Sequence, residues 1–351
     1  MNKNSKVFVA GYRGLVGSAV LRKLQALGYS NIAVGDRAEL DLRERRAVDE
    51  HFAREKPEYV FLAAAKVGGI LANNTYKAEF IYDNIAIASN VIDASYRNGV
   101  KKLLNLGSSC IYPKLAPQPL KEEYLLTGPL ESTNEPYAIA KIAAIKLCRY
   151  YNEQYGTNFL SVMPTNLFGP GDNFNLETSH VLPALIRKFH LAKLLNQGKI
   201  EELRADIGKR PLGFGLQLGP KADGKEVETL LGRVGISAKA VKLWGTGSPL
   251  REFLYVDDLA DAVVFLMSKY NYNDLGEFVN IGTGKDMPIK QLAERICRIV
   301  GFAGQIRFDS SKLDGTPRKL LDVTKMRSLG WEPKIGLEQG IKLTYDSYLS
   351  Q

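Results

Sequence analysis

Tyr137 and Lys141 lie four residues apart in the stretch Tyr-Ala-Ile-Ala-Lys. On a helix this spacing places both side chains on one face. A free phenol titrates near ~10, but a neighbouring ammonium favours the phenolate and lowers the pKa of the phenol. Such a tyrosine can give or take a proton at a carbinol or carbonyl oxygen. Many helices carry Tyr and Lys at this spacing by chance. Whether this pair is catalytic must therefore be judged from the elements around it.

A glycine-rich turn near the N-terminus supplies part of that context. Gly11, Gly14 and Gly17 follow a strand predicted over Lys6–Ala10 and lead into a helix predicted over 15–27. Gly11 permits a tight turn, Gly14 lets the backbone approach a pyrophosphate, and Gly17 allows helix and strand to pack closely. The free N–H groups at the start of the helix can bind the anion. The order of strand, glycines and helix therefore predicts a dinucleotide site.

Three charged residues bear on which dinucleotide binds there. Arg13, within the turn, and Arg37, after a strand predicted at Ile32–Val34, place positive charge where a ribose 2′-phosphate would lie. Asp36 favours the opposite choice, because an acid at the end of that strand usually accepts a hydrogen bond from an unphosphorylated ribose. The two arginines together favour NADP(H).

Length, charge and cysteine content exclude several classes of protein. The chain has 351 residues, a formal net charge of +9 and a pI near 9.2, so it can bury a sizeable core and suits an anionic ligand. The charge is dispersed, which argues against a nucleic-acid partner. The odd number and wide spacing of Cys110, Cys148 and Cys297 predict neither disulfides nor a metal site. Without an apolar signal region or an apolar run near the ~20 residues that span a bilayer, we expect no membrane segment and a cytoplasmic location.

Alternating strand and helix patterns predict an α/β fold, a doubly wound parallel sheet with helices on both faces and a smaller C-terminal substrate lobe. Strands are expected at Lys6–Ala10, Ile32–Val34, Tyr59–Leu62, Lys102–Leu106 and Asn158–Met163, with helices near 15–27, 44–55, 79–98 and 137–155. In the lobe we expect helices at Val181–Leu195 and near 257–268 and 289–300, and strands at Lys242–Leu243 and Glu252–Tyr255.

The domain boundaries follow from the break in this pattern after Met163. We expect a Rossmann domain at 1–165, with segments returning from the C-terminal half, and a substrate lobe at 166–351. Residues 196–240 form an insertion in that lobe. Its glycines and mixed charges indicate a solvated loop with short helices, as a surface elaboration or oligomer contact; a flap near the ligand is the alternative.

Further polar groups are expected at the carboxyl ends of the predicted parallel strands, near Tyr137. Ser108 follows the strand Lys102–Leu106 directly, so its hydroxyl can donate to a carbonyl oxygen while Tyr137 delivers a proton. A serine at a strand end is also a common turn former. Cys110 is either a buried apolar residue or a reactive group. His180, before the helix at Val181, is either a cap or an acid poised at the site.

Several segments together carry a resemblance to a known family: Ala63–Ile70, Asn73–Thr75, Leu106–Lys114, Thr133–Lys141, Met163–Leu167, Ser179–Val181, Arg251–Leu254 and Asp314–Asp322. In these segments the chain resembles the GDP-L-fucose synthase family, the GDP-4-keto-6-deoxy-D-mannose 3,5-epimerase/4-reductases of the extended short-chain dehydrogenase/reductase group. The likeness covers nearly all of the chain except 196–240. The insertion and Asp36 are the departures from the family pattern.

The resemblance implies two reaction stages at one site. Cys110 and His180 would exchange protons at C3 and C5 of the 4-keto sugar, and NADPH would then reduce the C4 carbonyl. Tyr137 would protonate O4, Lys141 would lower the pKa of Tyr137 and hold the nicotinamide ribose, and Ser108 would polarise the carbonyl.

The same resemblance implies the binding residues. Further cofactor contacts are implied for Leu42, Leu106, Ser109, Pro164, Asn166, Leu167 and, beside its acid role, His180. The GDP-sugar is implied to contact Lys188, Trp244, Arg251 and Asp314, where the cations suit a diphosphate.

Alternatives remain open from the residues alone. A sugar-nucleotide 4-epimerase or 4,6-dehydratase would share Tyr137, Lys141 and the glycine turn, but would not need Cys110 and His180. A non-catalytic dinucleotide sensor could use the same fold, although it need not keep Ser108. We expect the protein to be a homodimer.

Overall fold

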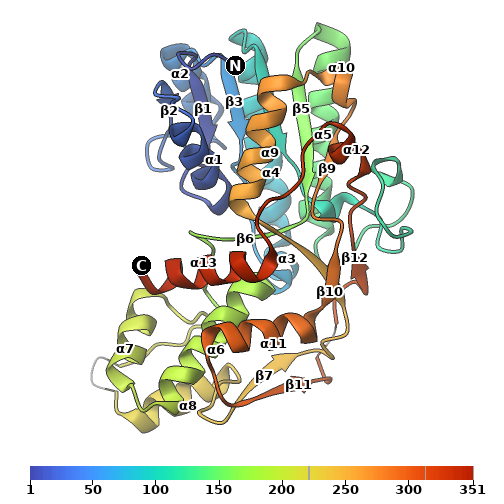
Figure 1. The fold of residues 1–351 in the computed structure, drawn as a ribbon. Coiled ribbons are helices and arrows are strands. Elements are labelled where there is room, and N and C mark those ends of the chain that lie inside the picture. Colours follow the sequence, from blue (N-terminus) through green and yellow to red (C-terminus); the bar gives the residue numbers. More distant parts are fainter. Residues whose placement is uncertain (220–221, 313, 351) are drawn as a thin grey trace.

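The computed structural model describes residues 1–219, 222–312 and 314–350. It consists of a helix-covered parallel sheet and a second lobe that lies beside the carboxyl ends of the strands (Figure 1). The predicted α/β fold class is confirmed. No helix in the described ranges is both long and apolar enough to span a bilayer.

The main sheet has six strands, all parallel. In spatial order they are β2 (Ile32–Ala33), β1 (Val7–Ala10), β3 (Tyr59–Leu62), β4 (Lys102–Leu106), β5 (Phe159–Pro164) and β9 (Val279–Ile281). Alternate residues of β1 face opposite sides of the sheet, so Val7 and Val9 enter one apolar cluster while Phe8 and Ala10 enter another. Burial on both faces explains why these strands are continuously apolar.

Helices cover both faces of this sheet. One face carries α1 (Leu15–Ala26) and α9 (Val256–Lys269), and the other carries α2 (Arg45–Glu55), α4 (Lys77–Arg97) and α5 (Glu135–Tyr155). The expectation that the helix near 257–268 lies in the smaller lobe is wrong, since α9 packs against α1. The physical reason is that the chain continues from α9 to β9, and β9 pairs with β5 at the edge of the main sheet. The helix that precedes β9 therefore packs on a face of that sheet.

The second lobe is built on two small sheets and several helices. One sheet combines β6 (Asn166–Phe168), β8 (Leu250–Tyr255), β10 (Asp286–Pro288) and β12 (Arg318–Lys319), and the other pairs β7 (Ala240–Trp244) with β11 (Gln305–Asp309). The helices α6 (Val181–Asn196), α11 (Ile289–Val300) and α13 (Leu337–Ser350) contribute to its core. Shorter elements complete the described chain: α3 (Ile70–Thr75), α10 (Tyr272–Leu275), α12 (Thr324–Ser328) and the 3₁₀ turns η1 (Ser109–Ile111) and η2 (Glu122–Tyr124).

The insertion 196–240 contains two helices, α7 (Ile200–Lys209) and α8 (Gly224–Arg233). Leu203 and Ile207 are spaced one turn apart and bury against the lobe, as does Leu231 of α8. The expected short helices are confirmed, whereas the expectation of a solvated segment is wrong where these apolar residues, at helical spacing, bury against the lobe. The segment is part of the lobe's core.

Candidate active site

The predicted Tyr137–Lys141 pair lies on the first turns of α5, which begins after Asn134 with Pro136 at a position that favours helix entry. The Lys141 ammonium donates to the carbonyl oxygen of Leu106 at 2.8 Å, at the end of β4. It also lies 5.7 Å from the centre of the Tyr137 ring. The helix thus presents both side chains to the carboxyl edge of the main sheet.

The electrostatics of this pair differ from the expectation. The pKa of Tyr137 is raised, chiefly by burial and further by Cys110, while a hydrogen bond with Ser108 opposes the rise. Burial also lowers the pKa of Lys141 to about 8. The predicted depression of the pKa of Tyr137 by Lys141 is wrong here, because burial of the phenol dominates its pKa, and the Lys141 ammonium donates to the Leu106 carbonyl. Tyr137 is accordingly a neutral phenol, the form that donates a proton.

Ser108 and Cys110 follow β4 and lie beside α5, as the sequence predicts. The Ser108 hydroxyl oxygen accepts from the backbone N–H of Cys110 at 3.4 Å, and Ser109 and Cys110 are both buried. Burial raises the pKa of the Cys110 thiol, whereas the ammonium groups of Lys319 and Lys141 act to lower it. The site therefore contains a thiol with two cations near it.

His180 stands at the N-cap position of α6, but its side chain makes no capping hydrogen bond. The residue is exposed to solvent, yet desolvation by the surrounding protein lowers the pKa of its imidazole, and the Lys319 ammonium adds to this effect. The loop before it is held by α3, since the Gly69 N–H donates to the Thr178 carbonyl at 2.8 Å. A Cβ on Gly69 would lie 2.5 Å from the Ser179 carbonyl oxygen, so this contact requires glycine.

Lys319 is a site residue that the sequence analysis did not select. It is the register partner of Arg251 in the parallel pair of β12 and β8, so the two cations share one face of the sheet. Burial lowers the pKa of both side chains, and Arg251 lowers that of Lys319 further. Lys319 and Cys110 line a small pocket of about 10 Å³ together. Two adjacent, partly buried cations can bind an anion.

The remaining predicted substrate residues gather in the second lobe. The Lys188 ammonium donates to the Lys242 carbonyl of β7 at 3.3 Å, and burial lowers the pKa of Lys188 to about 8. Trp244, on the same strand, is 58% exposed. Asp314 accepts from the backbone N–H of Thr246 at 2.9 Å. Gly315, next in sequence, lies close to the Arg251 guanidinium, so these residues form a continuous row that reaches Lys319.

The glycine turn has the geometry of a dinucleotide cradle. Gly11 has a φ of 81°, and a Cβ there would lie 2.8 Å from the backbone of Ala64. A Cβ on Gly17 would lie 2.1 Å from the carbonyl oxygen of Gly11. Gly14 is the N-cap of α1, without a side-chain cap or an acid in the first turn. The turn therefore fits a pyrophosphate at the helix N-terminus.

The three charged residues near the end of β2 are arranged unequally. Asp36 binds Arg13 through both carboxylate oxygens at 2.7 Å, and the Tyr12 hydroxyl donates to it at 2.6 Å. Arg37 is exposed and forms no hydrogen bond or ion pair with the residues that the structure describes, although its charge acts on Asp41. Asp36 is thus occupied within the protein, while Arg37 is available to an anion.

The other predicted cofactor residues lie along the same edge. Pro164 ends β5, and the chain then crosses to β6, where the Asn166 amide donates to the Glu252 carbonyl at 2.7 Å. Leu106 and Ser109 flank the turn after β4. Leu42 and Leu167 pack against the clusters on the two faces of the main sheet.

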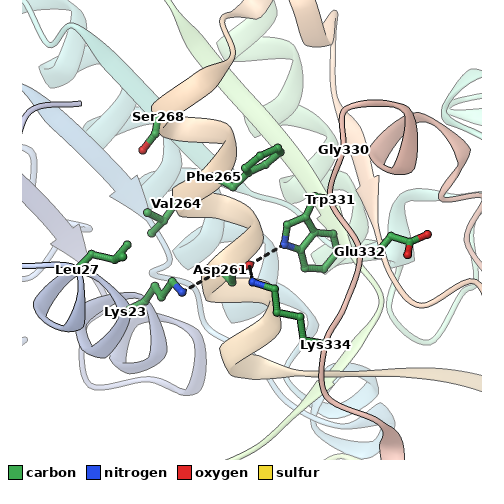
Figure 2. Close-up of a pocket in the computed structure, with 10 residues that line it drawn as sticks. All are labelled: Lys23, Leu27, Asp261, Val264, Phe265, Ser268, Gly330, Trp331, Glu332 and Lys334. Carbon is green, nitrogen blue, oxygen red and sulfur yellow. Dashed lines mark hydrogen bonds and ion pairs between the residues drawn. The ribbon is translucent and has the colours of Figure 1, made fainter.

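A separate hollow of about 370 Å³ lies between α1, α9 and the segment around Trp331 (Figure 2). At its centre Asp261 pairs with Lys23 at 2.5 Å and Lys334 at 3.0 Å, and accepts from the Trp331 indole N–H at 3.0 Å. These groups satisfy one another and join three segments. The hollow contains none of the predicted site residues.

No group of His, Cys, Asp and Glu within the described ranges could hold a metal ion. The three cysteines are free thiols, and all are buried.

Comparison with known proteins gives consistent matches over the whole chain. The model of the NAD dependent epimerase/dehydratase family matches residues 7–215 and 212–282. GDP-L-fucose synthase 1 of Arabidopsis thaliana is 52% identical over 99% of this chain and 94% of its own length. A GDP-6-OMe-4-keto-L-xylo-heptose reductase from C. jejuni has 43% identity and a TM-score of 0.93, covering 100% of this chain and 99% of that one. A GDP-L-fucose synthetase from Naegleria fowleri bound to NADP has 29% identity and a TM-score of 0.80, covering 100% and 95%.

Proposed function

The chain belongs to the NAD dependent epimerase/dehydratase family, and we propose that it converts GDP-4-keto-6-deoxy-D-mannose to GDP-L-fucose by 3,5-epimerisation and NADPH-dependent 4-reduction. The observation that supports the proposal is that Ser108, Cys110, Tyr137 and Lys141 lie at the carboxyl edge of the main sheet, while Lys319 acts on both Cys110 and His180. Ser108, Tyr137 and Lys141 form one set, and Cys110 with His180 forms the other.

The first set performs the reduction. Bound NADPH supplies the hydride to C4. Tyr137, held as a neutral phenol, donates its proton to O4 while Ser108 polarises the same oxygen. Lys141, anchored on the Leu106 carbonyl, holds the nicotinamide ribose beside Tyr137.

The second set performs the epimerisation. The C4 carbonyl acidifies the protons on C3 and C5, so a base can remove each in turn and an acid can return it to the opposite face. Cys110 is the base and His180 the acid. Lys319 supports this assignment, because its ammonium acts to lower the pKa of the buried thiol. Lys319 and Arg251, side by side, bind the diphosphate of GDP.

The alternatives are disfavoured by the same groups. A 4-epimerase or 4,6-dehydratase has no use for a thiol and an imidazole placed beside the reductase set. A dinucleotide sensor need not keep Ser108, Tyr137 and Lys141 together at the end of one strand. The cofactor is NADP(H), supported by the available Arg37 and by the NADP-bound relative.

A second candidate substrate is a GDP-4-keto-heptose, which the close structural match to a heptose reductase favours. The test is to supply NADPH with GDP-4-keto-6-deoxy-D-mannose or with a GDP-4-keto-heptose and to compare kcat/KM. Product NMR then shows the configuration at C3, C4 and C5. GDP-L-fucose as the preferred product supports the proposal. No NADPH oxidation with either sugar contradicts it.

We also propose a cytoplasmic homodimer. A reducing compartment keeps Cys110 as a thiol, which the epimerisation requires. The neighbouring helices α4 and α5 expose apolar side chains, among them Tyr82, Ile85, Ile139 and Tyr150, which a second copy could cover. The molar mass in solution tests the dimer.

A further inference from the structure

The loop between α7 and α8 holds an aromatic residue in an unfavourable backbone conformation. Phe214 has a φ of 57° and stands between Gly213 and Gly215, at 90° and 66°. Its backbone N–H donates to the Glu177 carboxylate at 2.6 Å. A bulky residue in the left-handed region is strained, and the surrounding contacts must enforce it. Glycine would fit this backbone better, so the phenyl ring requires an explanation.

The ring of Phe214 is directed at Trp244. The two ring centroids lie 6.4 Å apart at an interplanar angle of 60°. Phe214 is 37% and Trp244 58% exposed, so the pair presents aromatic surface to solvent instead of filling a core. The Lys312 ammonium lies 5.9 Å from the Trp244 ring.

The pair stands at one end of the row of substrate residues. Trp244 follows Lys242, whose carbonyl accepts from Lys188. The backbone N–H of Thr246, two residues after Trp244, donates to the Asp314 carboxylate. Gly315 lies close to the Arg251 guanidinium, and Arg251 is the register partner of Lys319. Lys319 lines a pocket with Cys110. A GDP-sugar with its diphosphate at these two cations and its sugar at Cys110 would extend its nucleoside toward Trp244. Phe214 lies on that side, on a loop from the insertion.

We propose that Phe214 and Trp244 together form the base-binding surface of the site, and that the insertion 196–240 supplies half of it. The inference rests on the proposed function, which provides a GDP-sugar as ligand. The purine ring has a π face that packs on an exposed aromatic side chain irrespective of hydrogen bonding. Phe214 thereby raises the affinity for the nucleotide, while the groups that react with the sugar remain unchanged.

The test measures GDP affinity by calorimetry in wild type, Phe214→Gly and Phe214→Tyr. Removing an aromatic partner of a base is expected to raise the Kd for GDP at least about fivefold. Phe214→Tyr should keep wild-type affinity. Phe214→Gly relieves the backbone strain, so its Tm should be no lower than that of wild type. The Kd for NADPH should not change, because the predicted dinucleotide turn lies on the main sheet, away from this loop.

Leu126→Gly is the matched control. Leu126 has a φ of 63° and is 59% exposed, in the turn after η2. This variant likewise replaces an exposed apolar residue at positive φ by glycine, but it removes no aromatic ring, so it should bind GDP like wild type. An unchanged Kd for GDP in Phe214→Gly would overturn the inference and leave the proposed function intact. Failure of wild type to bind GDP would instead overturn the proposed function and, with it, the inference.

Discussion

Asp206→Ala should destabilise the second lobe strongly, because Asp206 pairs with a fully buried cation. Arg187, 0% exposed, contacts Asp206 at 3.2 Å. Arg210 binds the second carboxylate oxygen at 3.1 Å, and the Tyr348 hydroxyl donates to the same oxygen. This carboxylate therefore joins α6, α7 and α13, and it lies within the insertion.

The magnitude follows from what remains after the substitution. Removing one partner of a buried ion pair costs about 3–5 kcal/mol, since the other charge stays buried without compensation. Arg187 keeps the carbonyl oxygens of Phe174 and Pro211, each at 3.0 Å, and that of Arg210. These acceptors place the expected loss of unfolding free energy near the lower limit, about 3 kcal/mol.

Urea denaturation followed by circular dichroism measures the difference in unfolding free energy. The control is Glu201→Ala, also on α7, which breaks the Arg204 pair with a side chain 84% exposed and should cost less than about 0.5 kcal/mol. If Asp206→Ala loses less than about 1 kcal/mol, the buried ion pair is not needed for the stability of the lobe. For the same reason, a Gly-Ser linker in place of 196–240 is expected to unfold the lobe rather than to report on a flap.

Three further outcomes test the chemistry. Tyr137→Phe should lose NADPH oxidation by about 10²-fold or more while still exchanging substrate protons with D₂O, and wild-type reduction would refute its role as donor. Cys110→Ser should slow proton exchange at C3 and C5 by about 10²-fold or more, because an alcohol is a far weaker base than a thiolate; unchanged stereochemistry at an unchanged rate would assign Cys110 to packing alone. Arg37→Ala should lower the NADPH over NADH ratio of kcat/KM roughly tenfold, since Arg37 is the arginine not already paired, and a constant ratio would contradict this assignment.

The sequence predicts the first half of the fold closely because its strands are buried on both faces. Tyr59–Leu62 and Lys102–Leu106 have the expected bounds, and β5 is displaced by one residue. The segment that completes the sheet is harder to find, because β9 has only three residues and its neighbour in the sheet, β5, lies far back in the chain. Without β9, the sequence gives no reason to place α9 on the main sheet.

Local spacing likewise predicts only part of the site. Tyr137 and Lys141 share a helix face, and Ser108 and Cys110 share one strand end, so their proximity follows from the chain itself. The pKa of Tyr137 does not follow from spacing, because burial is a property of the assembled site. In the same way, the pairing of Asp36 with Tyr12 depends on the rotamers of a turn and a strand end.

Lys319 shows most clearly what sequence spacing leaves out. It becomes a site residue only through its register with Arg251, and Glu252 fixes that register. The Glu252 carboxylate, 0% exposed, accepts from the backbone N–H of Leu321 at 3.0 Å and from that of Gly284 at 2.7 Å. Because side chains alternate along a strand, pinning Glu252 on one face directs Arg251 to the other. The buried Glu252 thus positions the two cations that we propose for the diphosphate, although the three residues are spread over nearly seventy positions of the chain.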